Sequence, residues 1–288
     1  MLIEPLLSEE ALVADIDAAD PGDGVLLWWL GQSGFLIKHR VGHILLDPYL
    51  SDSLTKKYRN TDKPHVRMTR LAVSPSLLRE IRLVTSSHNH TDHLDAETLL
   101  PLFDANPGIQ LLIPEANREF VCQRLSVPID WPIGLSDEES TEVCGIQIHA
   151  VPAAHNEIDR DVDGRCHYLG YVLKVGQYTI YHSGDTLRYP EMEDLLKPLA
   201  IDIALLPING NRTERRVAGN LWGDEAAWLA KDCGAKLVIP CHYEMFEFNT
   251  ETPELFTTTC DRIGQPFAVL QCGQTFYFPN NSTIRKLA

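Results

Sequence analysis

Four potential metal ligands lie together in one short segment of the chain. His88, His90, Asp92 and His93 follow one another in the pattern His-x-His-x-Asp-His. Imidazole nitrogens and carboxylate oxygens are ligands that suit Zn²⁺, and they also suit Mn²⁺ and Fe²⁺. A metal ion held in this way lowers the pKa of water toward neutrality. The segment therefore predicts metal-dependent hydrolysis.

Three further donors come at the ends of predicted strands. His155 follows the apolar run 145–152, Asp185 follows 178–182 and His242 follows 236–240. A single histidine after a strand is usually an ordinary surface or core residue. Because four clustered side chains cannot complete two metal sites, these three donors are the candidates for the remaining ligands.

The elements that must position these side chains alternate between strands and helices. Two hairpins resemble each other, 34–38 with 43–47 and 170–174 with 179–185, and their second strands lead to Asp47 and Asp185. The resemblance is either a chance likeness of two hairpins or the sign of two related halves packed face to face. The second interpretation predicts an α/β four-layer αβ/βα sandwich, as a single domain over residues 1–288. The remaining predicted strands are 25–30, 81–85, 202–206, 267–270 and 275–278, and the predicted helices are 9–19, 74–80, 95–103, 116–125, 191–196, 224–233 and 253–263.

Composition restricts the class of protein and its partners. The 288 residues are 44% hydrophobic and 23% charged, which is typical of a globular protein. Seven cysteines without a C-x-x-C pair indicate reduced thiols, and with no signal sequence we expect a cytoplasmic protein without a membrane segment. A net charge of -15 disfavours nucleic acid and leaves a small molecule as the expected substrate. A homo-oligomer is compatible with this composition.

The order of the candidate ligands resembles a known superfamily. Between about residues 28 and 242, the sequence is similar to the five motifs of the metallo-β-lactamase superfamily. Within the superfamily, the sequence most resembles the L-ascorbate-6-phosphate lactonase family. It departs from that family in two places. The 51–70 loop is shorter than the family implies, and His155 is a histidine ligand where the lactonase motif is less regular. The segments that carry the likeness are Asp47, His88–His93, His155, Ser183-Gly184-Asp185 and His242 for the superfamily, and Trp28-Trp29-Leu30-Gly31, Tyr181-His182-Ser183-Gly184-Asp185 and Val238-Ile239-Pro240-Cys241-His242 for the lactonases.

The resemblance implies a role for each of these residues. It implies two divalent ions, with Zn²⁺ the first candidate and Mn²⁺ or Fe²⁺ as alternatives. One ion would be bound by His88, His90 and His155, and the other by Asp92, His93 and His242. Asp185 would bridge them. Asp47 would support the cluster loop without touching metal.

Other side chains are candidates for catalysis and for substrate binding. Asp92 is expected to pass a proton to the leaving group as well as to bind metal. His182 is either an oxyanion stabiliser or a packing residue at a strand end. The arginines Arg212, Arg215 and Arg216 are either a handle for a phosphate or carboxylate or a solvated run of charge, and the same alternatives apply to Lys56, Lys57 and Arg59.

The leading hypothesis is a lactone or ester hydrolase acting on a small anionic metabolite. The alternative is a phosphodiesterase for a small phosphodiester or, against the charge, RNA. A diiron redox enzyme is disfavoured because His90 stands where such proteins usually carry glutamate. A non-catalytic binding module is disfavoured by the complete ligand set, and a β-lactamase by Asp185 in place of cysteine.

Overall fold

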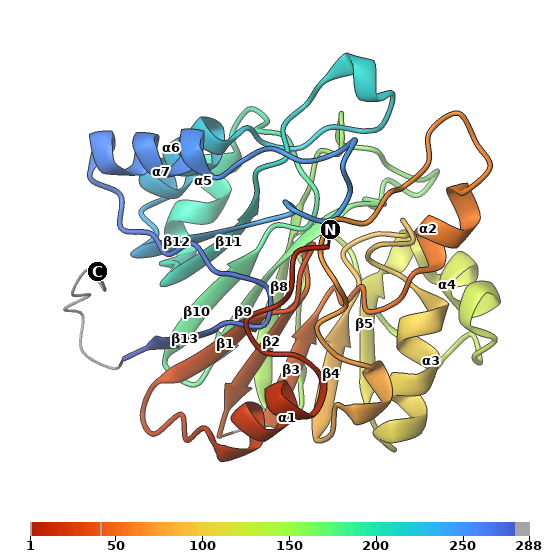
Figure 1. The fold of residues 1–288 in the computed structure, drawn as a ribbon. Helices are drawn as coiled ribbons and strands as arrows, with labels where there is room; N and C mark the ends of the chain where they lie inside the picture. Colours follow the sequence, from red (N-terminus) through yellow and green to blue (C-terminus); the bar gives the residue numbers. More distant parts are fainter. Residues whose placement is uncertain (1, 41, 280–288) are drawn as a thin grey trace.

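The structure is a computed structural model that describes residues 2–40 and 42–279. Two β-sheets pack against each other in the middle of the molecule, and helices cover their outer faces (Figure 1). The arrangement is the predicted four-layer α/β sandwich. Side chains of both sheets belong to one continuous hydrophobic core, with Trp28 and Tyr181 among its largest fully buried members.

The first sheet has seven strands and carries the cluster of potential ligands. Its middle strands are buried on both faces, which explains their unbroken apolar sequences. Strands β3 to β6 run parallel to one another, so their carboxyl ends lie at the same edge. The order across the sheet is β13 (Thr275–Phe278), β1 (Val25–Trp29), β2 (Phe35–His39), β3 (Gly42–Leu46), β4 (Ile81–Thr85), β5 (Gln110–Pro114) and β6 (Ile133–Leu135).

The second sheet has six strands and supplies the other ligands. Its strands β10, β11 and β12 are parallel, so their carboxyl ends also share one edge. The order across the sheet is β12 (Leu237–Cys241), β11 (Ile203–Pro207), β10 (Tyr178–His182), β9 (Leu169–Val175), β8 (Ile146–Pro152) and β7 (Ser140–Val143).

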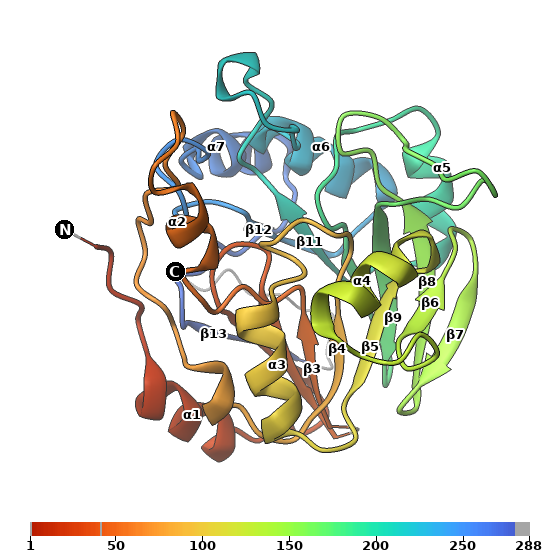
Figure 2. The same ribbon diagram turned by 90° about the vertical axis from the view of Figure 1, so that its right-hand side faces the viewer.

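The helices form the two outer layers, as the view turned by 90° shows (Figure 2). On the second sheet, α6 packs on β11 and β12 and against α7. α6 ends at Gly234, whose φ of +77° is a left-handed conformation that glycine adopts without strain. The helices are α1 (Glu9–Ala18), α2 (Ser53–Tyr58), α3 (Ala96–Ala105), α4 (Arg118–Leu125), α5 (Met192–Leu196), α6 (Gly223–Cys233) and α7 (Glu254–Ile263).

Most predicted elements are present within one or two residues, but the sequence did not predict strands β5, β6 and β7. Residues 267–270 form no strand, and only an isolated bridge joins Phe267 to Val238. The predicted helix 74–80 is a single 3₁₀ turn, Pro75–Leu77, because the chain turns extended at Leu78. The expected loop 51–70 contains α2, and Leu54, Lys57 and Tyr58 of this helix line the same cavity as His90 and Asp92.

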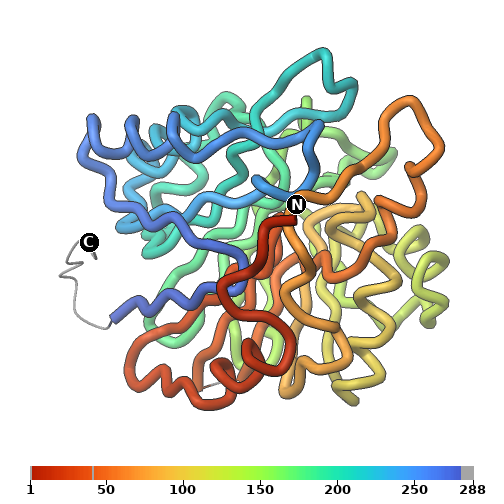
Figure 3. The backbone as a smooth tube through the Cα atoms, viewed as in Figure 1, coloured from red at the N-terminus to blue at the C-terminus, as the bar shows by residue number. Residues whose placement is uncertain are grey.

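The path of the backbone, drawn as a tube in Figure 3, places the N-terminal residues beside the loops that follow α2. Ile3 pairs with Thr69 in an isolated bridge, and its N–H donates to the carbonyl of Met68 at 2.8 Å. The start of the chain is therefore held against Met68 and Thr69, in the segment that follows α2. Within the described ranges, no helix is long and apolar enough to cross a bilayer.

Candidate metal centre

The predicted ligands come from four loops at one edge of the two sheets. The segment from His88 to His93 follows β4, and His155 follows β8. Asp185 follows β10, and His242 comes directly after β12. In the second sheet, β8 and β10 are both antiparallel to β9, so β8, β10 and β12 run in the same direction and end at one edge. Because β4 ends at the corresponding edge of the first sheet, the two facing sheets bring these four loops together.

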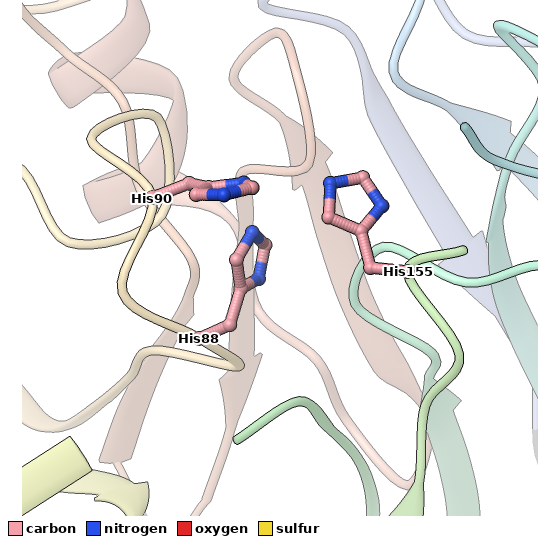
Figure 4. Close-up of side chains that lie close together, drawn as sticks. All are labelled: His88, His90 and His155. Atoms are coloured by element: carbon pink, nitrogen blue, oxygen red, sulfur yellow. The ribbon is translucent and has the colours of Figure 1, made fainter. Parts of the chain in front are cut away.

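Three histidines converge on one point. The potential ligand nitrogens of His88, His90 and His155 lie within 4.8 Å of one another. Figure 4 shows the three imidazoles pointing toward a shared space, two from the loop after β4 and one from the loop after β8. The ring of Tyr168 packs beside all of them, with centroids 5.1–5.9 Å away.

A second group lies beside the first. Asp92, His93 and His242 offer ligand atoms within 4.8 Å of one another. Asp185 stands between the two groups. Its Oδ2 is 3.2 Å from Nε2 of His242 and 3.7 Å from Nε2 of His155, while Oδ1 is 3.3 Å from Nε2 of His93. The structure therefore brings together all seven side chains that the sequence suggested as ligands.

The tautomers of three imidazoles are set by hydrogen bonds behind them. Nδ1 of His155 donates to the carbonyl of Gly219 at 3.0 Å, and Nδ1 of His93 donates to Oδ2 of Asp47 at 2.7 Å. Nδ1 of His88 lies 3.0 Å from the Ser87 hydroxyl. With Nδ1 engaged in this way, each Nε2 faces the shared space, where the unprotonated nitrogen can bind metal.

Several of these atoms are buried without a partner. Nε2 of His88, Nε2 of His93 and Oδ1 of Asp185 have no hydrogen bond within the described residues. A buried polar atom left unpaired costs about 1–3 kcal/mol. Cations bound between the two groups would satisfy these atoms, so the donor set fits divalent metal.

The electrostatics of the site favour cation binding. Burial lowers the pKa of His88 well below its usual value and that of His155 to about 4, so both rings are neutral donors at pH 7. Burial alone would raise the pKa of Asp185, but His242 and His93 hold it well below the usual range. The carboxylate is thus ionised in the middle of the donor set.

Asp47 braces the ligand loop from behind. Besides His93, it accepts hydrogen bonds from the Ser87 backbone N–H, the Ser87 hydroxyl and, at 2.8 Å, the Thr85 hydroxyl. Its side chain is fully buried. These contacts are those of the supporting role that the resemblance implied, since Asp47 touches ligands and not the shared space.

Close backbone packing holds the loops in place. Gly184 has φ +59°, and a Cβ added there would lie 2.6 Å from Cβ of Ser87. The loop before Asp185 can therefore approach the loop before His88 only with glycine at this position. Asp47 and His242 also adopt a positive φ, of 38° and 62°, which is a strained conformation that clusters at functional sites.

Gln32 was not anticipated from the sequence. It follows β1 in the turn Gly31-Gln32-Ser33-Gly34 and is buried. Its Nε2 lies 2.7 Å from Oδ2 of Asp92 and 2.9 Å from Nε2 of His242, and its carbonyl accepts from the His242 backbone N–H. The only sequence signal was its place directly after a strand, which many turn residues share.

A cavity of about 430 Å³ opens over the two ligand groups. Its floor includes His90, Asp92, His155, Asp185 and His242. Such a volume suits a small molecule. The walls carry mainly apolar and aromatic side chains with two cations, namely Leu54, Lys57, Tyr58, His65, Phe120, Arg124, Val217, Phe246 and Phe248.

The structure does not bring His182 to this cavity. The side chain is fully buried between the sheets, where its Nε2 donates to the carbonyl of Ser33 at 2.9 Å and its ring meets Phe35 edge-on. This position fits the packing alternative and supports the turn that carries Gln32. Asp92, by contrast, lines the cavity.

The three arginines of the predicted anion handle are engaged elsewhere. They lie in and beside the 3₁₀ turn Thr213–Arg215, and the cavity is lined by the next residues, Val217 and Ala218. Arg212 and Arg215 both pair with Glu251, and Arg216 pairs with Asp62 at 2.7 Å. Lys56 pairs with Glu97, whereas Lys57 lines the cavity.

Comparison with known proteins agrees with the fold. Residues 26–242 match the model of the beta-lactamase superfamily domain. A UPF0173 metal-dependent hydrolase of Caldivirga maquilingensis is 27% identical over 234 residues, which cover 80% of this chain and 87% of the relative. Another, of Methanocorpusculum labreanum, is 30% identical over 203 residues, covering 67% of this chain and 84% of the relative.

A solved structure shares the same architecture. Igni18, a metallo hydrolase of the archaeon Ignicoccus hospitalis, superimposes with a TM-score of 0.65 at 22% identity, over 90% of this chain and all of that one. The chain therefore belongs to the metallo-β-lactamase superfamily, in the family of UPF0173 metal-dependent hydrolases.

Proposed function

We propose that this protein uses a dinuclear metal centre to hydrolyse a lactone or ester of a small anionic metabolite. The observation that carries the proposal is the position of Asp185. Its two oxygens face donors of both groups, His93 on one side and His242 and His155 on the other. A carboxylate with such neighbours is suited to bridge two cations.

The residues divide into two sets around that carboxylate. His88, His90 and His155 would hold one ion, and Asp92, His93 and His242 the other. The mixture of imidazole and carboxylate favours Zn²⁺, with Mn²⁺ or Fe²⁺ as alternatives. Bound there, the ions would activate a water molecule and polarise the carbonyl oxygen under attack.

The chain's own residues would orient the substrate and move the proton. Asp92 lines the cavity beside the ligand groups, where its carboxylate can accept a proton from the attacking water and pass it on to the leaving oxygen. Gln32 fixes the direction of Asp92 by donating to its Oδ2 at 2.7 Å. The aromatic wall of the cavity excludes water around the reacting bond.

The walls of the cavity disfavour the nucleic acid member of the alternative substrate class. They expose cations only at Lys57 and Arg124 among the described residues, apart from the histidines. One anionic group can be neutralised there, but a nucleic acid strand needs an extended basic track, and the net charge is -15. A small phosphodiester remains the second candidate, because the same metal chemistry would serve it.

The test is a substrate screen with the metal-loaded protein on lactones, carboxylated esters and phosphodiesters. We expect turnover of a lactone or ester that is lost on chelation. Asp185→Asn, prepared identically, is the matched control, because it removes the bridging charge and keeps the shape of the side chain. Turnover of a phosphodiester alone would overturn the proposal in favour of the second candidate. Equal turnover by the variant would assign the activity to a contaminant.

A further inference from the structure

Arg124 is a half-buried cation on the wall of the cavity. It lies on α4, and its guanidinium stacks on the ring of Phe120 with Cζ 4.4 Å from the centroid. Burial lowers the pKa of Arg124, and the negative charge of Asp95 raises it by a smaller amount. The described residues give Arg124 no carboxylate partner in a salt bridge, in contrast to Arg118 on the same helix, which pairs with Glu115 at 2.7 Å.

Among the residues that the structure describes, hydrogen bonds are made to only one edge of this guanidinium. Nη1 donates to the carbonyls of Asn89 at 2.8 Å and Leu94 at 3.1 Å. Asn89 lies between His88 and His90, so the group is held directly beside the first ligand trio. The donors on Nε and Nη2 have no protein partner among the described residues, and together they form the fork that grips a carboxylate or phosphate through parallel hydrogen bonds.

Lys57 gives the cavity a second positive side chain. It projects from α2 at the rim, with Nζ 5.1 Å from the ring centroid of Tyr58. Its neighbour Lys56 is neutralised by Glu97 at 2.6 Å. Among the described residues, neither Lys57 nor Arg124 has a carboxylate partner in a salt bridge, whereas Arg212, Arg215 and Arg216 outside the cavity are paired.

We propose that Arg124 binds an oxyanion of the substrate, a carboxylate or a phosphate, through its free Nε and Nη2 donors, with Lys57 attracting it at the rim. This subsite rests on the proposed hydrolase function and adds the contact that selects the substrate. An anion held beside Asn89 leaves the rest of the molecule over the ligand groups. The aromatic wall of Tyr58, His65, Phe246 and Phe248 then covers the linking carbon chain.

The experiment compares two esters of the same length with the metal-loaded protein. They are the 4-nitrophenyl monoester of glutarate, which ends in a carboxylate, and 4-nitrophenyl valerate, which ends in a methyl group. Arg124→Gln should raise KM for the glutarate ester about 10-fold or more relative to KM for the valerate ester, over and above any loss that both esters share through the ligand loop. Arg124→Lys should recover part of the loss, because it restores charge without the fork. Arg262→Gln, at an exposed position on α7, is the matched control and should change neither ester.

Arg124 could instead serve only to hold the ligand loop. Equal losses on both esters would show that purely structural role, and no loss on either would show that the substrate does not reach Arg124. A 4-nitrophenyl ester of 4-phosphonobutyrate, in which phosphorus takes the place of the carboxylate carbon of glutarate, separates the two oxyanions. A lower KM for this ester than for glutarate assigns the subsite to phosphate, and the reverse order assigns it to carboxylate.

Two measurements keep the proposal testable if Arg124→Gln fails to fold or to retain metal. The wild-type protein should show KM values that rise from the glutarate ester to valerate and to an ester ending in trimethylammonium. A preference for the cationic ester would overturn the subsite. If the wild type turns over no ester, the proposed function fails, and calorimetric titration with glutarate tests the subsite alone. Weaker binding of glutarate to Lys57→Gln than to the wild type would support the subsite. No binding of glutarate to the wild type would rule the subsite out.

Discussion

Nδ1 of His93 donates a hydrogen bond of 2.7 Å to Oδ2 of Asp47, a fully buried carboxylate at the end of the neighbouring strand β3. The bond fixes the imidazole so that Nε2 faces Asp185 at 3.3 Å. Asp47 also accepts from Ser87 and Thr85, so one carboxylate ties the ligand loop to the strand before it. Orientation of the histidine and stability of the loop thus depend on the same group.

Replacement of Asp47 should weaken metal binding although Asp47 is not itself one of the potential metal ligands. Asp47→Asn keeps the shape but loses the charge that holds Nδ1–H of His93. We expect a loss of about 10–100-fold in metal affinity, measured by competition with a chromogenic chelator. Asp15→Asn, far from the cluster, is a control of the same chemistry. Unchanged affinity in Asp47→Asn would show that the brace is dispensable.

The arginines outside the cavity should differ from one another in stability. Arg215 is 10% exposed and donates to the carbonyl of Thr250 at 2.8 Å as well as to Glu251 and Asn209. Arg215→Ala should lower the free energy of unfolding by about 1–3 kcal/mol in urea titration. Arg216→Ala, which removes an exposed pair with Asp62, should lower the free energy of unfolding much less. Equal effects would mean that the buried contacts of Arg215 do not form.

The same arginines provide a test of the role that their sequence suggested. If the cavity wall decides which anions bind, Arg212→Ala should leave kcat/KM for the glutarate ester within about twofold of the wild type, because Arg212 is committed to Glu251 at 2.6 Å. A loss of about 10-fold or more, absent for the valerate ester, would instead assign the anion handle to this loop.

The thiols should react according to their burial. Burial raises the pKa of Cys166, Cys260 and Cys272 to about 12 and that of Cys233 to about 11, whereas Cys144 is partly exposed. Because the thiolate is the reacting form, these four buried thiols should label slowly at pH 8, and faster as the pH rises toward their pKa values. Titration of the native protein with a chromogenic disulfide should show Cys144 reacting first. Rapid labelling at several sites would contradict the buried positions.

The ligands were predictable because each belongs to a short local pattern. A turn with closely spaced His and Asp after an apolar strand, and single donors directly after three other strands, are visible in the sequence, and the parallel strands bring them together. The two hairpins leading to Asp47 and Asp185 do lie in opposite sheets, in accordance with two halves packed face to face.

The partners of charged side chains could not be found in this way. Glu251 lies 36 residues after Arg215, and Arg124 meets Asn89 across 35 residues, so no local pattern links them. The sequence therefore does not reveal the ion-pair partners of the three arginines, and it does not distinguish Arg124 from other surface residues of a helix. The apolar run 267–270 has the sequence of a strand but forms only an isolated bridge among the described residues. Whether a run pairs with a neighbouring strand depends on the fold, so its sequence alone was misleading.

The number of metal ions bound per chain tests the central claim most directly. Protein loaded with Zn²⁺ and freed of excess metal should carry close to two ions per chain by elemental analysis, and hydrolysis should fall to background on chelation. His90→Ala and His242→Ala should each reduce the content toward one ion, since each belongs to a different ligand group. A wild-type content of one ion that only one of these variants removes would contradict a dinuclear centre, and no metal above background would contradict a metal site altogether.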